Sequence, residues 1–304
     1  MKSTNADRHP TKPPNEAECR VPSTECQVIH IAHSPDSDDA FMFYALAEGL
    51  IDTGNLRYVH ELQDIESLNR RALKGELEVT AVSIHAYAHL ADTYALLSSG
   101  CSMGDGYGPR LVSKSPPPDD ARQALADQRI AVPGTLTTAY LALRLFQPRF
   151  EPVPLPFDRI GEAVHAGDVP AGLLIHEGQL TFGDQGLHLW ADLGAWWLAE
   201  TGLPLPLGGN AVRRDLGPSV MAQVARDLRA SIEYGLGHRE IALAHARRYN
   251  RGLSDERTDA FVGMYVNQWT VDYGDRGRQA VQLLLDRGHQ AGIIPRRVAA
   301  DFIG

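Results

Sequence analysis

The 304-residue sequence contains only three cysteines. A low, odd count in a chain of this length does not indicate a disulfide framework, and it favours a reducing compartment. Cys19 and Cys26 lie seven positions apart with no further pair of histidines or cysteines beside them, which argues against a zinc site. We therefore expect no bound metal.

Long apolar segments and an excess of positive charge are also missing. No window reaches 18 consecutive apolar residues, and the polar, proline-rich residues 1–27 lack the apolar stretch of a secretory signal. We expect residues 1–27 to be a disordered extension. The 29 basic and 38 acidic side chains give a formal net charge of -9, which argues against nucleic acid or an anionic membrane as partner. These absences favour a cytoplasmic protein that binds a small molecule.

Motifs for cofactors and activated nucleophiles are absent as well. Gly104, Gly106 and Gly108 lack the spacing of a dinucleotide-binding loop, and the sequence has neither a Walker phosphate loop nor the Gly-x-Ser-x-Gly motif of hydrolases. His85 and His89 have the i, i+4 spacing that can hold a metal on a helix. No third ligand is evident, so packed or solvated side chains are the favoured interpretation. We expect no organic cofactor.

What the sequence does contain is an alternation of short apolar strands with helices. Hydrophobic residues make up 43% of the chain, enough for a packed interior. A strand over 28–32 precedes a buried helix over 40–50, and further helices are predicted over 84–97 and 295–302. The alternation predicts an α/β fold with mainly parallel sheets that helices cover on both faces.

Breaks near Pro109 and Pro206 predict two crossovers between two lobes. Lobe 1 would comprise residues 28–109 and 206–304, and lobe 2 residues 110–205. Ligands of such sheets bind beyond the carboxyl ends of the strands, so we expect a cleft between the lobes. The sequence does not fix the oligomeric state, and a homodimer is compatible with it.

Polar residues follow several predicted strands. Ser34 and Asp38 lie between the first strand and its helix. The turn 134–138 opens a helix with two threonines, which suits either an anion site or simple helix capping. His176 follows an apolar strand over 171–175, where an imidazole with a pKa near neutrality is a natural general base. The sequence therefore predicts a polar site in the cleft.

A series of short motifs resembles, in its order, the 1,4-dihydroxy-6-naphthoate synthase family. The resemblance runs from about residue 28 to the C-terminus. Its motifs are SPDSDDAFMFYAL (34–46), DIESLN (64–69), TAVSIHAY (80–87), GTLTTA (134–139), HEGQ (176–179), DLGAWW (192–197) and TGLPLPLG (201–208). Each motif is weak alone, whereas the ordered series is specific. Some family members carry Cys-Pro-Asn-Asp-Thr at positions 36–40, so the loop of this chain is more acidic.

The resemblance implies a two-lobe fold like that of type II periplasmic binding proteins, used as an enzyme without metal or organic cofactor. The family is a group of carbon-carbon lyases of menaquinone biosynthesis, in the futalosine pathway, that convert cyclic dehypoxanthine futalosine to 1,4-dihydroxy-6-naphthoate. His176 would be the base that starts the fragmentation. The substrate-binding residues would be Ser34, Asp38, Ser83, Ile84, Thr137 and Thr138.

Two other functions fit the same scaffold, because a fold alone does not fix function. A solute-binding protein for a small carboxylate would share the two lobes, but the missing secretory signal argues against it. Chorismate dehydratase is a second enzyme on this fold. The segments 176–177 and 196–197 fit the naphthoate enzyme better.

Overall fold

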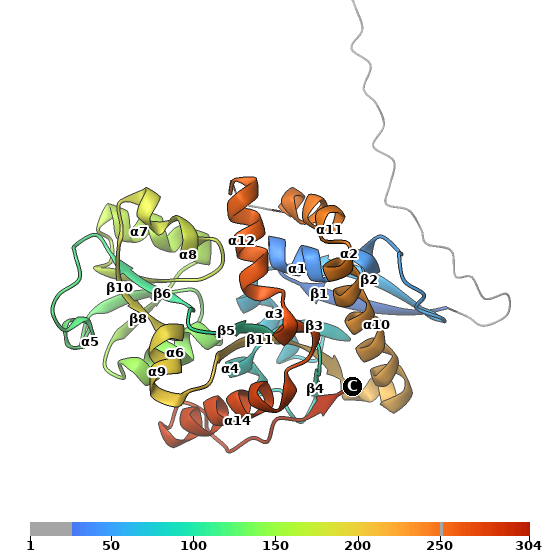
Figure 1. The fold of residues 1–304 in the computed structure, drawn as a ribbon. Coiled ribbons are helices and arrows are strands. Elements are labelled where there is room, and N and C mark those ends of the chain that lie inside the picture. The colour runs from blue at the N-terminus through green and yellow to red at the C-terminus, as the bar shows by residue number, and fades with distance from the viewer. Residues whose placement is uncertain (1–25, 250–251) are drawn as a thin grey trace, which may run out of the picture.

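The computed structural model describes residues 26–249 and 252–304, and these residues form two α/β lobes (Figure 1). The disordered extension expected at 1–27 falls almost entirely outside the described residues. Lobe 1 carries a seven-stranded sheet. In spatial order its strands are β12 (Phe302–Ile303), β4 (Tyr94–Leu97), β11 (Leu205–Arg213), β3 (Val79–Ser83), β1 (Gln27–His33) and β2 (Leu56–Leu62), with β5 (Ser102–Gly104) paired to β11.

Lobe 2 carries a five-stranded sheet, on the left of Figure 1. Its strands in spatial order are β10 (His188–Asp192), β6 (Arg110–Ser113), β9 (Ala171–Leu174), β7 (Arg129–Val132) and β8 (Glu151–Pro154). The helices of this lobe are α5 (Ala121–Ala124), α6 (Thr138–Phe146), α7 (Ile160–Ala166), α8 (Gly178–Thr181) and α9 (Leu193–Thr201), with the 3-10 turns η1 (Phe157–Arg159) and η2 (Phe182–Gln185).

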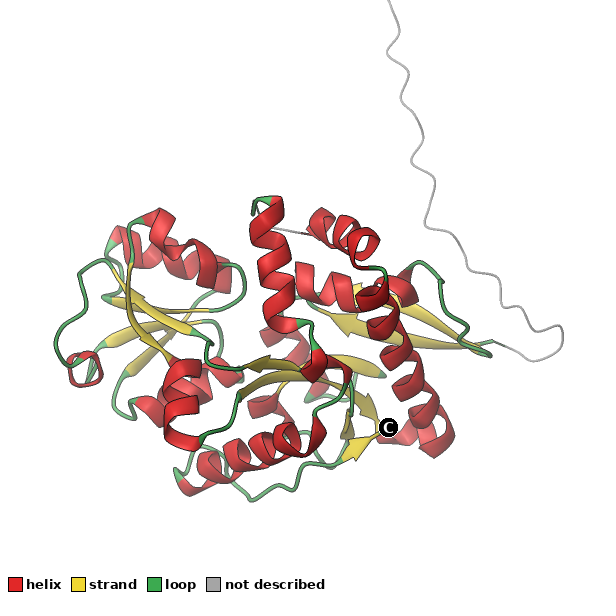
Figure 2. Cartoon of the chain, viewed as in Figure 1, coloured by secondary structure: helices red, strands yellow, loops and turns green. Residues whose placement is uncertain are grey.

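Helices surround the sheet of lobe 1 on the right of Figure 2. They include α1 (Ser37–Met42), α2 (Tyr44–Ala47), α3 (Ile65–Ala72), α4 (Ile84–Tyr87) and α13 (Gln268–Val271). The others are α10 (Gly217–Gly237), α11 (Arg239–Ala246), α12 (Asp255–Tyr265) and α14 (Gly274–Gln290), with the 3-10 turns η3 (Arg214–Leu216) and η4 (Arg247–Tyr249). None of the described helices is long and apolar enough to cross a membrane.

Both sheets are mixed, so the expectation of mainly parallel sheets is wrong in part. Strand β1 runs parallel to β2 and β3, and β7 runs parallel to β8 and β9. In contrast, β11 is antiparallel to β3 and β4, and β6 is antiparallel to β9 and β10. A parallel neighbour needs a long crossover segment. Strands β6 and β11 begin just after the chain has passed from one lobe to the other, and each enters its sheet in the opposite direction.

The lobes are joined by packed side chains as well as by two crossover segments. Helix α14 of lobe 1 contacts α4 and also α6 of lobe 2, and α4 contacts α6. The apolar cluster at this junction includes the fully buried Trp197, Tyr87 and Tyr273. A second cluster, around Phe41 and Phe43, fills lobe 1 beneath α10 and α11. Burial of these large side chains stabilises the interior of lobe 1 and the contact between the lobes.

Three helix predictions differ from the structure. The predicted helix over 84–97 ends as α4, and its second half is strand β4, which pairs with β11 and β12. Residues 295–302 form no helix and lead into β12. The helix predicted over 40–50 is split at Phe43 into α1 and α2. The two described cysteines are in different states. Cys26 is disulfide-bonded, whereas Cys101 is a buried free thiol.

Candidate active site

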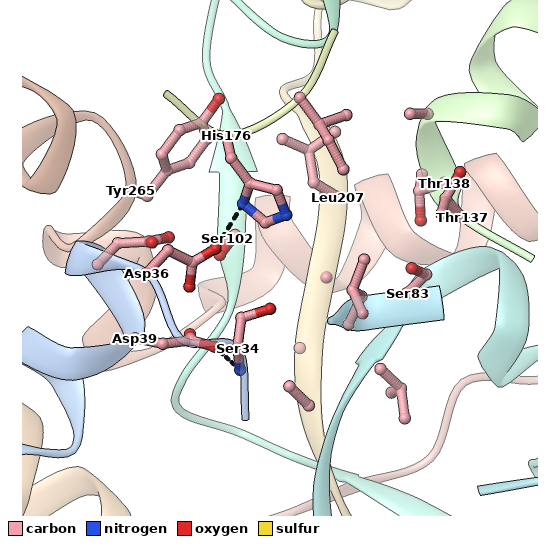
Figure 3. A pocket seen from close by; sticks show the side chains of 18 of the residues that line it. Ser34, Asp36, Asp39, Ser83, Ser102, Thr137, Thr138, His176, Leu207 and Tyr265 are labelled. Atoms are coloured by element: carbon pink, nitrogen blue, oxygen red, sulfur yellow. Dashed lines mark hydrogen bonds and ion pairs between the residues drawn. The ribbon is translucent and has the colours of Figure 1, made fainter. Parts of the chain in front are cut away.

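A cavity of about 110 Å³ lies between the lobes, which is several times the space that one water molecule needs. The sequence-predicted residues that line it are Ser34, Asp38, Ser83, Thr137, Thr138 and His176. Ile84 is not in this lining, because its side chain is fully buried in the core between the lobes. A contact between Ile84 and substrate is therefore not supported through its side chain. Figure 3 shows how the labelled residues converge on this space.

His176 stands just beyond the carboxyl end of β9, where the sequence places it. Its backbone has φ of 52°, a left-handed conformation that costs a non-glycine residue about 1–2 kcal/mol. Its Nδ1 lies 2.6 Å from Oδ2 of Asp36, and the ring meets Phe157 edge-on at 4.8 Å. Its Nε2 is buried and has no hydrogen-bond partner among the described residues. That nitrogen is therefore available to a ligand.

Asp36 is a site residue that the sequence prediction missed. It occupies the position before α1 where a short polar side chain normally caps the helix, yet its side chain makes no capping hydrogen bond. Instead it reaches across the cavity to His176. Its acidic character was the only signal in the sequence, and that signal cannot be told apart from an ordinary helix cap.

Buried carboxylates surround His176 and shift its pKa. Burial alone would disfavour the charged ring, but the charge and hydrogen bond of Asp36, with smaller effects of Glu177 and Asp38, raise the pKa of His176 to about 9. Burial also raises the pKa of Asp38 well above its ordinary value. Burial and the nearby Asp36 raise the pKa of Asp39 to about 8, against the hydrogen bond that Ser34 N donates to it at 2.7 Å.

Hydroxyl groups form the opposite wall of the cavity. Thr137 caps α6 by accepting a hydrogen bond from Tyr140 N at 3.2 Å, so the capping interpretation holds for that residue. Thr138 Oγ1 accepts from His85 N at 3.2 Å, and Ser83 Oγ accepts from Asn69 Nδ2 at 3.0 Å. The hydroxyl hydrogens of Thr138 and Ser83 have no acceptor among the described residues, so both can donate to a ligand in the cavity.

A carboxylate of lobe 1 already contacts the turn predicted to hold an anion. Glu66 Oε2 accepts a hydrogen bond from Leu136 N at 3.2 Å. It lies so close to Gly134 that an added Cβ there would approach it to 2.2 Å. Burial raises the pKa of Glu66, against the opposing effect of Arg70. The turn therefore contacts a carboxyl group of the protein itself, and its binding of a substrate anion stays a prediction.

His85 lies on α4, and His89 lies just beyond the end of that helix. The rings of His85 and His89 lie 5.9 Å apart, and His85 Nδ1 contacts the carbonyl of Thr137 at 3.3 Å. Within the described residues, no group of three or more histidine, cysteine or carboxylate side chains is placed to hold a metal ion. His85 is buried, whereas His89 is exposed.

Comparison with known proteins identifies relatives of this chain. The profile of a family described as menaquinone biosynthesis matches residues 29–290. A protein of Thermus thermophilus named 1,4-dihydroxy-6-naphthoate synthase is 42% identical over 267 residues, which cover 88% of this chain and 96% of that protein.

Solved structures show the same architecture. A crystal structure of a protein from Archaeoglobus fulgidus superposes with a TM-score of 0.83 at 48% identity, covering 88% of this chain and 98% of that one. The alkanesulfonate-binding protein of Xanthomonas axonopodis pv. citri, bound to MOPS, gives a TM-score of 0.66 at 15% identity, covering 91% of this chain and 98% of that one. The predicted α/β fold of the periplasmic-binding-protein type is therefore confirmed.

Proposed function

The chain belongs to the menaquinone biosynthesis family, and we propose that it is the lyase that converts cyclic dehypoxanthine futalosine to 1,4-dihydroxy-6-naphthoate. A 42%-identical relative that carries the name of this enzyme is matched over 96% of its length. The observation in the structure that supports the proposal best is the buried, unpartnered Nε2 of His176 at a cavity between two lobes. An imidazole in that position can remove a proton from an enclosed substrate.

The residues around the cavity have different roles in the proposed reaction. His176 Nε2 takes the proton that starts cleavage of the carbon-carbon bond, and the sugar-derived part of the substrate leaves. Donors on the opposite wall, from Ser83 and Thr138, hold the polar groups of the substrate. Enclosure between the lobes excludes water and fixes the reacting geometry. No metal or organic cofactor takes part in this scheme.

The same proposal covers the setting of the enzyme. It would act in the cytoplasm on a small-molecule substrate, without a nucleic-acid or membrane partner. Both the site and the acidic balance of the chain, with a formal net charge of -9, are consistent with such a substrate. A homodimer stays a prediction.

The test is turnover by the full-length protein. Incubation with cyclic dehypoxanthine futalosine should yield 1,4-dihydroxy-6-naphthoate, detected by mass. His176→Asn should lower the rate by at least ~10², since a positioned base typically contributes ~10²–10⁴. His188→Asn, at an exposed histidine of β10 outside the cavity, is the matched control and should keep the wild-type rate.

Other outcomes would assign the chain differently. Thermal stabilisation by a small carboxylate without product at any enzyme concentration would indicate a binding protein. Loss of water from chorismate would indicate chorismate dehydratase. Wild-type turnover by His176→Asn would remove this residue from the mechanism.

A further inference from the structure

Asp36 and His176 belong to different lobes. Asp36 lies in the loop between β1 and α1 of lobe 1, whereas His176 follows β9 of lobe 2. Their side chains meet at 2.6 Å, and only 3% of the Asp36 side chain and 17% of the His176 side chain are exposed. This ion pair therefore crosses the cleft in its interior and forms only where the lobes approach each other.

The surroundings leave Asp36 free for this one partner. Its side chain does not make the capping hydrogen bond that its position before α1 would allow. Its other oxygen, Oδ1, is buried without a hydrogen-bond partner among the described residues. Burying an unpaired carboxylate is energetically costly. The contact with His176 offsets that cost for Asp36.

We propose that Asp36 is a positioning residue for the base: it holds the His176 ring so that Nε2 faces the cavity, and it does so only when the lobes are closed. This inference rests on the proposed function, in which His176 removes a proton. Closure of the two lobes would then enclose the substrate and also orient the His176 ring. In an open enzyme the ring would lack this fixed orientation. Such coupling between closure and assembly of a site limits side reactions.

The proton balance follows from the contact. A hydrogen on Nδ1 is donated to Asp36 Oδ2, which leaves the lone pair of Nε2 directed at the cavity. When Nε2 accepts the substrate proton, the ring carries hydrogens on both nitrogens and a positive charge. The neighbouring carboxylate of Asp36 stabilises that charge. Asp36 itself neither gains nor loses a proton.

Other carboxyl groups lie near the same ring, and they add to the effect of Asp36 only to the extent that they are ionised. Asp38 and Asp39 approach it from α1, and Glu177 follows it in the chain. Asp36 has the largest effect among these carboxylates, with both its charge and its hydrogen bond, and it acts against the burial of the ring. Since the pKa of His176 is about 9, about one ring in a hundred is neutral at pH 7. Activity should therefore rise with pH towards about 9.

The pH dependence of kcat/KM tests the proposal. In Asp36→Asn the rising limb should move to lower pH by about 1–3 units, the usual effect of one opposite charge. The plateau rate should fall by about 10², because the ring loses its fixed orientation. A role confined to folding would not move the limb.

The matched control is Asp184→Asn. Asp184 of lobe 2 also forms an ion pair across the lobes, with Arg257 of α12, but it is exposed and does not line the cavity. This variant removes an interlobe carboxylate contact outside the cavity and should leave the limb where the wild type has it. An unmoved limb in Asp36→Asn, or an equal shift in Asp184→Asn, would overturn the proposal.

A second measurement does not need turnover. Nitrogen NMR of the histidine rings, with His176 assigned by comparison with His176→Asn, reports the protonated nitrogen and the pKa directly. We expect Nδ1 of the neutral ring to carry the hydrogen and the pKa to drop by about 1–3 units in Asp36→Asn. An unchanged pKa would refute the pairing. A wild type that shows the pairing but makes no product would instead refute the proposed function.

Discussion

At the residue scale, the hydroxyl group of Thr138 has two roles. Its oxygen accepts from His85 N at 3.2 Å, and its hydrogen is free to donate into the cavity. Thr138→Val keeps the shape of the side chain but removes that donor. Because a hydrogen bond to a charged group contributes about 1.5–3 kcal/mol, KM should rise at least roughly tenfold while kcat changes less. Steady-state kinetics with cyclic dehypoxanthine futalosine gives both values.

Thr201→Val controls for the loss of a structural hydrogen bond. Thr201 Oγ1 donates to Trp197 O at 2.7 Å and accepts from Leu203 N at 3.1 Å, so this hydroxyl also supports the backbone. It does not line the cavity. Its variant should keep the wild-type KM. Equal increases of KM in both variants would show that Thr138 acts through stability alone.

The sequence predicts some site residues and misses others for a physical reason. His176 was predictable because the end of a strand and a local motif both mark it. Asp36 and Glu66 were not, because each acts on a partner in the other lobe. Their roles depend on how far the cleft is closed, and no local pattern encodes that distance.

At the scale of elements, the first crossover segment, at Tyr107 and Gly108, touches the start of α9 at Gly194. An added Cβ at Gly194 would lie 1.8 Å from the carbonyl oxygen of Tyr107, and one at Gly108 would lie 2.8 Å from Gly194 N. The obstructing atoms are backbone, so they cannot move aside like a flexible side chain. Gly194→Ala should lower the free energy of unfolding by at least about 1–3 kcal/mol, measured by urea denaturation.

Gly183→Ala is the matched control in the same lobe. An added Cβ at Gly183 would meet nothing within 4 Å, so its free energy of unfolding should stay within about 0.5 kcal/mol of the wild type. If Gly194→Ala were equally harmless, the close contact between the first crossover segment and α9 would not stabilise the fold.

Element boundaries show where local reasoning fails. The apolar run over 84–97 fits a helix, yet Tyr94–Leu97 becomes β4 because β11 and β12 offer it hydrogen-bonding partners. Those partners lie more than a hundred residues later in the chain, so periodicity alone cannot reveal them. The α/β class survives such errors because it depends on the overall alternation of elements rather than on each one.

At the scale of the whole molecule, groups in the cleft link stability to pH. Folding raises the pKa of His176 from 6.5 to about 9 and that of Asp39 from 3.8 to about 8. Between pH 6.5 and 8 the unfolded chain has largely released these two protons, whereas the folded protein largely retains them. At these two groups the folded state binds more protons, so their contribution to stability falls as pH rises through this window.

We accordingly expect these two groups to lower the melting temperature as the pH is raised from 6.5 to 8. Each retained proton lowers the free energy of unfolding by at most about 1.4 kcal/mol per pH unit. For a chain of this size, each kcal/mol corresponds to roughly 2–4 °C. Differential scanning calorimetry over a series of buffers at constant ionic strength measures the slope.

The slope should be shared between the two groups in an identifiable way. Asp39→Asn and His176→Asn each remove one retained proton, so each variant should show a shallower decline than the wild type. Asp184→Asn should keep the full slope, because the hydrogen bond from Arg257 lowers the pKa of Asp184 and the group is ionised in both states over this range. A slope that neither cleft variant changes would mean that these protons are not held in the folded cleft.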